Sequence, residues 1–492
     1  MRAFHLVGGF GAMAVVLLAC SGDDVAATFP DSGSGSDSGG DVGPDVVAPP
    51  GCDLAKDVKE SVACIDNGIG VFVDGATGDD AVGNGTKAKP YKTINKAIAN
   101  AGAKLRVYVC GGTYAEDVAL DVTNAVGIFG GLACTTWAYD GTKPIIGAGL
   151  NALKIDTVGK QVVVADVAFV SGAGVAAGDS SVAAFVKNSA NVLLRRVRLT
   201  AGAGKAGAPG TTGTNWTAIA QSDPAIAGNN ASGTTGGGTH ACNACTDAVP
   251  TSGGSGGGGG LTPGGGGNGL PNLSANPPTD GAGGASGCVA GHNGATAGNA
   301  SNGPGATASG DLLAAGWKAS RGTDGKNGGP GQGGGGGGGG TSVNGGGGGG
   351  GACGGCGGAA GKAGGSGGSS IALASLGSAV TLAECELSAA AGGAGGDGSA
   401  GQVGQAGGFA GVAASPGCAG GNGGTGAPGS AGGGGAGGGS LGVVYKGTAP
   451  ALDAPTTTKT TVAASAAAKG KGGATGVNDG ADGAFAALLE LK

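Results

Sequence analysis

One eight-residue stretch, VLLRRVRL at residues 192–199, decides the fold expected of this chain. Its pattern, apolar-x-apolar-x-x-apolar-x-apolar, recurs in VVVADVAF at 162–169 and in VTLAECEL at 380–387. A unit this small cannot bury its own apolar face, so such units must stack and cover one another. The repeat therefore predicts a coil, with long insertions leaving the stack as loops.

Stacking predicts the direction of each side chain in a unit. At 192–199 the residues expected to point inward are Val192, Leu194, Val197 and Leu199. A two-residue bend turns the corner between the two halves of the unit. The residues expected to face solvent are Arg195, Arg196 and Arg198.

In-register stacking also predicts two outward columns. One contains Asp166, Arg196 and Glu384, and the next contains Ala168, Arg198 and Glu386. Such charges can form a structural ladder, in which each cross-strand pair contributes about 0.2–1 kcal/mol, less in salt. They can instead form a groove that binds an acidic or neutral polysaccharide. The candidate binding residues are Arg196, Arg198, Glu384 and Glu386.

The N-terminus has the features of an export signal. Arg2 precedes an apolar run from Leu6 to Leu18, which is shorter than the about 20 residues that span a bilayer. The ending LLAC at 17–20 resembles the lipobox of bacterial lipoproteins, and this resemblance implies a lipid on Cys20 and a place at the outer membrane or cell surface. A plain secretory signal is the alternative.

Composition limits the rest of the chain. Residues 21–50 are acidic and small, and they cannot offset their ordering entropy by burial, so a flexible tether is expected. With 124 Gly in 492 residues and 3% aromatic residues, a large aromatic core is excluded. A net charge of −6 gives no basic surface for nucleic acid.

Twelve cysteines are present, and lipidation of Cys20 would leave an odd number for pairing. In an exported protein disulfides are the expected state, and the natural local pairs are Cys52 with Cys64 and Cys110 with Cys134. The motifs CNAC at 242–245 and CGGC at 353–356 have zinc-knuckle spacing. We favour disulfides that pin the loops over a zinc site.

The most conventional block lies between residues 69 and 131. It contains the strand VFVD at 71–74, a turn-rich loop, a predicted amphipathic helix from Ile94 to Ala101, and the run VYVCGGTYAE at 107–116. This order of parts resembles the opening module of bacterial right-handed parallel β-helix proteins of the pectin-lyase-like superfamily. The resemblance implies an all-β, right-handed parallel β-helix with an N-terminal capping helix.

Two Gly-rich insertions interrupt the stack, at 201–368 and 389–439. Their Gly-Gly-x texture is similar to the PGRS repeats of mycobacterial surface proteins, and a collagen period is absent. Such tracts can form extended helices with three residues per turn that pack side by side, or remain unstructured. We expect disorder for the pure runs at 256–260 and 333–340 and partial packing near the coil.

These features predict the following domain layout: signal peptide 1–20, tether 21–50, cap and first turns 51–200, insertion 201–368, one turn 369–388, insertion 389–439, and last turns with a C-terminal cap 440–492. The last apolar segment, 484–491, is either a strand or a capping helix.

Signals of catalysis are weak. The motif GTYAE at 112–116 fits the Gly-x-Tyr-x-Glu motif of pectin methylesterases, but the other motifs of that family are missing, so Tyr114 is expected to pack at a strand end. Asp74, Asp79 and Asp80 are expected to form a solvated turn, with a calcium loop as the alternative. No histidine can be placed in a catalytic triad. We predict no cofactor and no metal.

The sequence therefore predicts a non-catalytic, lipid-anchored protein of the bacterial cell envelope. Its Gly-rich loops would serve adhesion, matrix building or carbohydrate contact, with the membrane, polysaccharide or surface proteins as partners. The alternative is a polysaccharide lyase or hydrolase, although the paired carboxylates that a glycosidase uses are missing from the predicted face.

Overall fold

The computed structural model describes residues 47–246, 249–273, 280–474 and 476–492. The chain divides into two units, residues 1–45 and 46–492. Cys20 and almost all of the predicted tether lie outside the described residues. None of the helices in the described ranges has the length and apolarity of a membrane-spanning segment.

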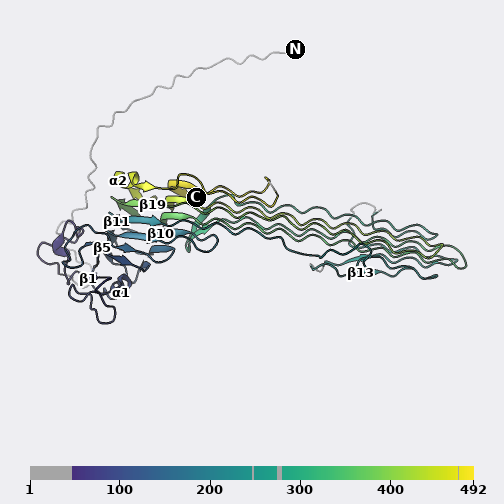
Figure 1. Ribbon diagram of the computed structural model, residues 1–492, viewed down its shortest axis with the longest axis horizontal. Helices are drawn as coiled ribbons and strands as arrows, with labels where there is room; N and C mark the ends of the chain where they lie inside the picture. The colour runs from purple at the N-terminus through teal and green to yellow at the C-terminus, as the bar shows by residue number, and fades with distance from the viewer. Residues whose placement is uncertain (1–46, 247–248, 274–279, 475) are drawn as a thin grey trace, which may run out of the picture. The chain divides into compact units, whose positions relative to one another are not determined.

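Three sheets of parallel strands wind into a coil (Figure 1). In spatial order, the first sheet is β1 (Gly70–Val73), β2 (Arg106–Cys110), β5 (Gly127–Leu132), β8 (Val162–Ala165), β11 (Val192–Arg195), β18 (Val380–Ala383) and β21 (Ala451–Leu452). The second sheet is β22 (Thr460–Thr461), β19 (Glu386–Ala389), β12 (Arg198–Ala201), β9 (Ala168–Ser171), β6 (Ile145–Ile146) and β3 (Thr113–Tyr114). The third sheet is β23 (Phe485–Leu491), β20 (Ser440–Lys446), β17 (Ser370–Leu376), β10 (Ser181–Lys187), β7 (Asn151–Asp156) and β4 (Val118–Asp121).

The register confirms the predicted stacking. Leu194 in β11 pairs with Val164 in β8 on one side and with Leu382 in β18 on the other. All three side chains are fully buried in one continuous apolar core. The four residues predicted to point inward at 192–199 belong to the same core. The chain is a parallel β-helix.

Three successive turns bend at the same place, directly after β8, β11 and β18. Asp166, Arg196 and Glu384 adopt the left-handed backbone conformation, with φ of 56°, 52° and 55°. Residues with a Cβ rarely adopt this conformation, because the Cβ crowds the backbone. The predicted two-residue bend is thus confirmed, and the same strained corner recurs in successive turns.

The opening module contains a helix where the sequence predicts one. The helix α1 (Ile94–Ala99) follows β1, and its residues Ile94, Ala97 and Ile98 are buried in the main core. The carboxylate of Glu116 accepts the backbone amides of Ile94 and Asn95, which satisfies N–H groups that the first helical turn leaves unpaired. A short 3-10 helix, η1 (Val62–Cys64), lies in the segment that precedes β1.

The insertions all leave the coil at the same corner. The chain departs after β12, β19 and β22 and returns as β17, β20 and β23, so residues 462–484 form a third excursion that the sequence analysis did not predict. The last apolar segment is the strand β23. The first excursion also carries the hairpins β13 (His240–Cys242) with β14 (Thr251–Gly253) and β15 (Gly310–Leu313) with β16 (Gly316–Ala319).

Two smaller elements complete the coil. The helix α2 (Ala454–Thr458) lies beside β18 in the last turn, with Asp453 as its N-cap. The β15–β16 hairpin covers the outer face of the third sheet, where Leu312 and Trp317 join an apolar cluster with residues of β10, β17 and β20.

Extended segments from the described parts of the excursions at 202–369, 390–439 and 462–484 run side by side and are here called the glycine bundle (Figure 1). Within 333–340, the amides of Gly333, Gly336 and Gly339 donate to residues 264–270. Those of Gly334, Gly337 and Gly340 donate to residues 346–352, and those of Gly335 and Gly338 donate to residues 289–292. This threefold sharing is what an extended helix with three residues per turn allows. The expected disorder of the pure glycine runs is therefore wrong.

Close packing explains why these runs are glycine. A Cβ on Gly336 would lie 1.8 Å from the carbonyl oxygen of Ser255, and one on Gly351 would lie 1.8 Å from that of Gly334. Non-bonded atoms pack at about 3.5–4.0 Å. Removal of every Cβ lets the backbones approach within hydrogen-bonding distance, and the bonds offset the entropy that glycine loses on ordering.

Candidate functional site

The two predicted charged columns have different environments. Asp166, Arg196 and Glu384 occupy equivalent corners, and β12 and β19 pair Arg198 with Ala168 and with Glu386, as predicted. Arg196, however, is only 8% exposed, so the prediction that it faces solvent is wrong. The segment before β1 folds over this corner and covers it.

Arg196 is the centre of a buried ion network. Its Nε and Nη2 donate to the two carboxylate oxygens of Asp166, both at 2.8 Å, and Nη2 also donates to Asp57 at 2.6 Å. Arg195 reaches the same Asp57 carboxylate at 3.0 Å and Glu60 at 3.4 Å. The Arg196–Asp166 pair matches the structural ladder that the sequence predicts between successive turns. On its other side Arg196 pairs with Asp57, in place of the predicted Glu384.

The electrostatics of the network follow from its partners. Burial alone would lower the pKa of the Arg196 guanidinium, but hydrogen bonds and charges from Asp166 and Asp57 outweigh burial and raise it. Burial alone would raise the pKa of Asp57, but Arg196 and Arg195 outweigh it and the pKa is lowered. Arg196 and Asp57 therefore both stay charged at neutral pH.

Arg198 and Glu386 lie instead on an open groove of about 390 Å³ on the outer face of the second sheet. The other residues that line it are Thr200, Leu387, Ser388, Lys459 and Thr461. Thr200, Ser388 and Thr461 form a column of hydroxyl groups across β12, β19 and β22. Sequence reasoning missed Lys459 and this column, although the register of the turns places them beside the predicted pair.

The groove carries more positive than negative charge. Lys459 Nζ lies 3.2 Å from Glu386 Oε1, and this hydrogen bond is the main reason that the pKa of Glu386 is lowered. Lys143 and Arg198 also interact with the Glu386 charge. Glu386 is the only carboxylate among the lining residues, whereas glycoside hydrolysis uses two carboxyl groups on one site.

Glu384 lies at its corner apart from the ion network. Its side chain is exposed, and its backbone amide donates to the Asp453 carboxylate at 2.8 Å. The predicted binding set is thus divided: Arg196 is buried in the ladder, Glu384 is at the corner, and Arg198 and Glu386 share the groove.

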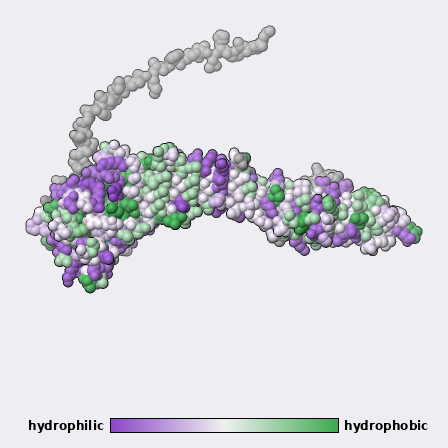
Figure 2. Space-filling view, viewed as in Figure 1, coloured by the Kyte–Doolittle hydropathy of each residue, from purple (hydrophilic) through white to green (hydrophobic). Residues whose placement is uncertain are grey.

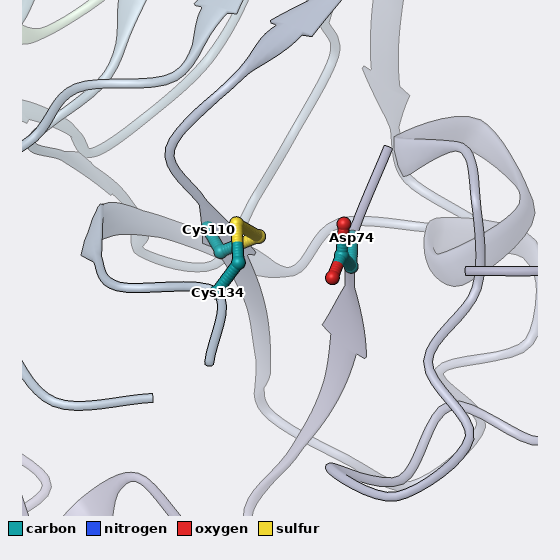
Figure 3. Close-up of side chains that lie close together, drawn as sticks. All are labelled: Asp74, Cys110 and Cys134. Atoms are coloured by element: carbon teal, nitrogen blue, oxygen red, sulfur yellow. A yellow bond between two sulfur atoms is a disulfide. The ribbon is translucent and has the colours of Figure 1, made fainter. Parts of the chain in front are cut away.

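Three potential metal ligands meet in the opening module, where Figure 3 shows Asp74 beside Cys110 and Cys134. The two sulfur atoms are bonded to each other, so neither is available as a thiolate ligand. The Asp74 carboxylate accepts the amides of Ala76 and Thr77 and the Thr77 hydroxyl. This group is therefore a disulfide next to a turn-capping carboxylate.

The neighbouring carboxylates have similar structural roles. Asp79 accepts the amides of Ala81 and Val82, and Asp80 accepts those of Lys92 and Thr93. Within the described ranges, Asp74, Asp79 and Asp80 do not converge as a ligand cluster. The contacts of Asp79 and Asp80 match the predicted turn, whereas Asp74 is only 3% exposed, so the prediction that it is solvated is wrong. The three carboxylates leave the calcium alternative without a shared site.

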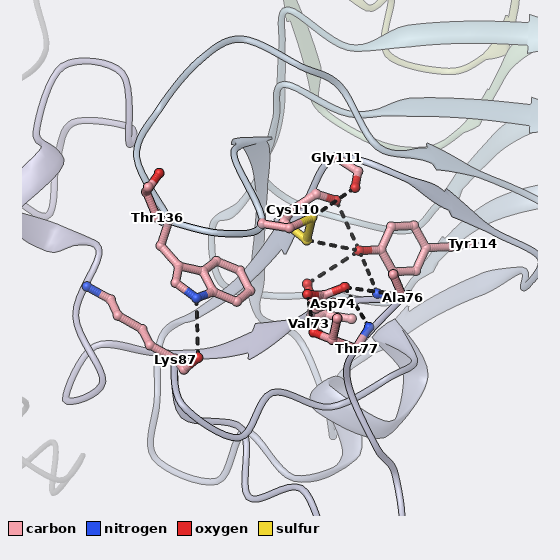
Figure 4. Close-up of a disulfide and its surroundings, with 12 residues drawn as sticks. Val73, Asp74, Ala76, Thr77, Lys87, Cys110, Gly111, Tyr114 and Thr136 are labelled. Atoms are coloured by element: carbon pink, nitrogen blue, oxygen red, sulfur yellow. Dashed lines mark hydrogen bonds between the residues drawn. A yellow bond between two sulfur atoms is a disulfide. The ribbon is translucent and has the colours of Figure 1, made fainter.

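Tyr114 packs as predicted for a structural residue. Its hydroxyl oxygen lies 3.0 Å from the Cys110 carbonyl oxygen and 3.3 Å from that of Val73 (Figure 4), so that its single proton is shared between them. The same oxygen accepts the amide of Gly75. Burial raises the pKa of Tyr114 to about 12. The Gly-x-Tyr-x-Glu match is therefore a strand-end anchor, with Glu116 capping α1.

A pocket of about 400 Å³ lies beside this disulfide, and sequence reasoning did not predict it. It is lined by Trp137, whose indole donates to the Lys87 carbonyl, and by Asp79 and Lys89 among others. No pattern in the sequence indicated this pocket, because its walls come from separate loops of the opening module.

The cysteines form disulfides. Both predicted local pairs, Cys52–Cys64 and Cys110–Cys134, are confirmed. The two CxxC motifs pair with each other as Cys242–Cys353 and Cys245–Cys356, which supports the prediction of loop-pinning disulfides and excludes a zinc-thiolate site there. A fifth bond joins Cys288 and Cys418, and the leftover thiol is the buried Cys385.

Five turns gather at the end of the glycine bundle, here called the bundle tip: residues 232–235, 260–264, 285–289, 341–344 and 414–417. A bridge joins Gly260 to Thr341, and the Cys288–Cys418 disulfide lies beside them. None of these turns contains a charged residue.

The bundle tip exposes aliphatic side chains. Leu261 is 71% exposed and Val343 77% exposed, and Figure 2 shows hydrophobic patches in green along the bundle and at its end. The signal in the sequence is the interruption of glycine by Leu-Thr-Pro at 261–263 and Thr-Ser-Val-Asn at 341–344. Sequence reasoning missed it, because the turns come from segments far apart along the chain.

Comparison with known proteins reaches only part of the chain. Residues 76–238 match a family described as a protein of unknown function, DUF1565, which is associated with parallel β-helix proteins. The match covers most of the opening module, the turns as far as β12 and the start of the first insertion. Neither a curated protein nor a solved structure matches the chain.

Proposed function

We propose that this protein is a non-catalytic, lipid-anchored protein of the bacterial cell envelope, in which the β-helix carries a stiff glycine bundle for adhesive contact. The observation that carries the proposal is the bundle tip, where uncharged turns expose Leu261 and Val343 beside a disulfide. Large exposed apolar groups on a folded surface are typical of interaction sites.

The bundle is suited to holding such a tip away from the coil. Residues 345–368 are extended at about 3.1 Å per residue, which gives a reach of about 70 Å. Along this segment, the backbone amides donate hydrogen bonds to several neighbouring segments of the same chain. Two disulfides also join it to residues 242–245. Cross-linking on several sides resists bending more than a single loop could.

The absence of charge on the tip turns favours an uncharged partner surface, because no ionic attraction is available there. The groove on the second sheet has the opposite character. Its cations Arg198 and Lys459 and its hydroxyl column fit an acidic carbohydrate, so we infer that it is a second, weaker contact.

Anchoring rests on the lipobox-like LLAC ending and on the acidic residues that follow it. A lipid at Cys20 would hold the folded part at a membrane that it does not cross. The chain expressed with its own signal in a bacterial host should fractionate with membranes, and the Cys20→Ala variant should be released. A wild-type chain found wholly in the soluble fraction would contradict the anchor.

Adhesion is tested with labelled mature chain on immobilised neutral glycans, acidic glycans and whole bacterial envelopes. We expect a Leu261→Asp, Val343→Asp variant to lose binding to uncharged surfaces about tenfold or more, because each aspartate would have to be desolvated on contact. Val175→Asp is a matched control, since Val175 is 82% exposed on a loop of the coil.

The groove has its own test in the same assay. Arg198→Glu should weaken binding to acidic glycans and leave the tip contact unchanged. Release of unsaturated or reducing sugar ends by the wild-type chain would show catalysis and overturn the non-catalytic proposal.

A further inference from the structure

The last turn of the coil contains three strands that, among the described residues, pair with another strand on one side only. β21, β22 and β23 are the outermost strands of the three sheets on that side. Each outermost strand has a row of backbone groups without a strand partner, and such an edge is a template for another chain. A coil end therefore presents three edges at once, in a fixed arrangement.

The same end leaves part of the apolar lumen open. A pocket of about 280 Å³ is lined by Pro450, Leu452, Thr457, Thr460, Ala487 and Leu488. Leu488 pairs with the fully buried Val443 of the preceding turn, yet it is itself 49% exposed. The row of core side chains therefore ends in a half-exposed leucine at this end of the coil. Phe485 on the same strand is 51% exposed.

The first turns differ from this end. There α1 packs against β1, β2 and β4 and buries Ile94, Ala97 and Ile98 in the core. Among the described residues of the last turn, the only helix is α2, which contacts β18 at the corner instead of covering the lumen.

We propose that the last turn is a self-association surface, on which a second copy of this chain docks end to end. A two-fold axis across the coil end would place β23 antiparallel to β23 of the other copy, centred near Leu488. The same axis exchanges the first and second sheets, so β21 would meet β22 of the partner. Both of these strands are two residues long, and their edges therefore match.

The chemistry of the end favours a copy over another occupant. All six residues that line the pocket are uncharged, so two identical ends do not repel each other. A single peptide strand could satisfy one edge only, whereas another coil end satisfies three together. An isologous interface of this kind closes after two copies, which is the commonest form of soluble assembly.

Analytical ultracentrifugation of the full mature chain carrying Cys20→Ala tests the proposal without lipid. We expect a concentration-dependent dimer that Leu488→Arg converts to monomer and Leu488→Met preserves. Val343→Arg, a change of equal charge on the bundle tip, should leave the dimer intact. A wild-type chain that stays monomeric at all concentrations, or a dimer insensitive to Leu488→Arg, overturns the proposal.

A covalent trap gives a second measurement that does not depend on the folding of the arginine variant. Because the proposed axis passes near Leu488, Leu488→Cys should form an interchain disulfide with its own copy under mild oxidation. Val343→Cys should not cross-link. Equal cross-linking of the two variants, or none, would rule out end-to-end pairing. Both measurements are independent of any adhesive ligand.

Discussion

Arg196 and Asp166 pair through two parallel hydrogen bonds, Nε to Oδ1 and Nη2 to Oδ2, each 2.8 Å long. Both residues occupy the left-handed corner of successive turns, so the pair joins one turn to the next at its most strained position. Asp57, from the segment before β1, closes on the same guanidinium. The network therefore fastens this segment to the coil.

Loss of Arg196 should be costly. Arg196→Met would remove the cation that is paired with the buried Asp166 carboxylate and leave Asp57 with Arg195 alone, and breaking a buried pair costs about 3–5 kcal/mol. Chemical denaturation should show this loss. Arg198→Met is the control, because Arg198 lies on the open groove and exposed pairs contribute about 0–1 kcal/mol. Equal effects of the two changes would contradict the structural role of Arg196.

Acid should weaken the same contact. The pKa of Asp57 is lowered in the folded chain below its usual 3.8, so the unfolded chain binds this proton at a higher pH than the folded chain does. The stability that Asp57 contributes is present above its unfolded pKa and is lost as pH falls through the folded pKa. Thermal unfolding across this acidic range should depend less on pH in Asp57→Asn than in the wild type. Parallel profiles would be evidence against the linkage.

A single methyl group should disrupt the glycine bundle. Gly336→Ala would place Cβ 1.8 Å from the Ser255 oxygen and should destabilise the fold by about 1–3 kcal/mol or more. Gly298→Ala is the matched control, since its Cβ would have no neighbour within 4 Å. That change should be neutral or stabilising by up to about 1 kcal/mol. Thermal unfolding distinguishes them, and similar midpoints would mean that the bundle is loosely packed.

Amide exchange should report the order of the pure glycine run. Each amide from Gly333 to Gly340 donates to a carbonyl of a neighbouring segment, so exchange should be slow. Hydrogen–deuterium exchange with mass spectrometry measures this directly. The turn at 232–235 serves as an exposed reference. Exchange of 333–340 at the rate of an unstructured peptide would disprove the threefold bonding.

Thiol mapping should find the five described disulfides and leave one cysteine unpaired. Cys385 is fully buried, and burial raises the pKa of its thiol to about 11, so it should resist alkylation in the native chain and react after denaturation. Non-reducing digestion identifies the bonds. A Cys242–Cys245 bond within one motif would conflict with the pairing between the two motifs of the first insertion.

Local patterns were enough to predict the coil. Val192, Leu194 and their counterparts recur at fixed spacing, and that spacing decides which side chains turn inward in every turn. The groove pair Arg198 and Glu386 follows from the same register. The burial of Arg196 could not be predicted from that register. It depends on the segment around Asp57, more than a hundred residues earlier, and the repeat pattern does not indicate where that segment lies.

The residue order alone thus defined a stacked coil, the points where its two long insertions leave, and the nearest cysteine pairs, since all of these depend on spacing along the chain. Only the tertiary structure decided whether the glycine runs are ordered. An isolated run of glycine loses more entropy on ordering than any other sequence and has no side chain to bury. Only neighbours brought in from distant segments supply the carbonyls that hold Gly333–Gly340 in place.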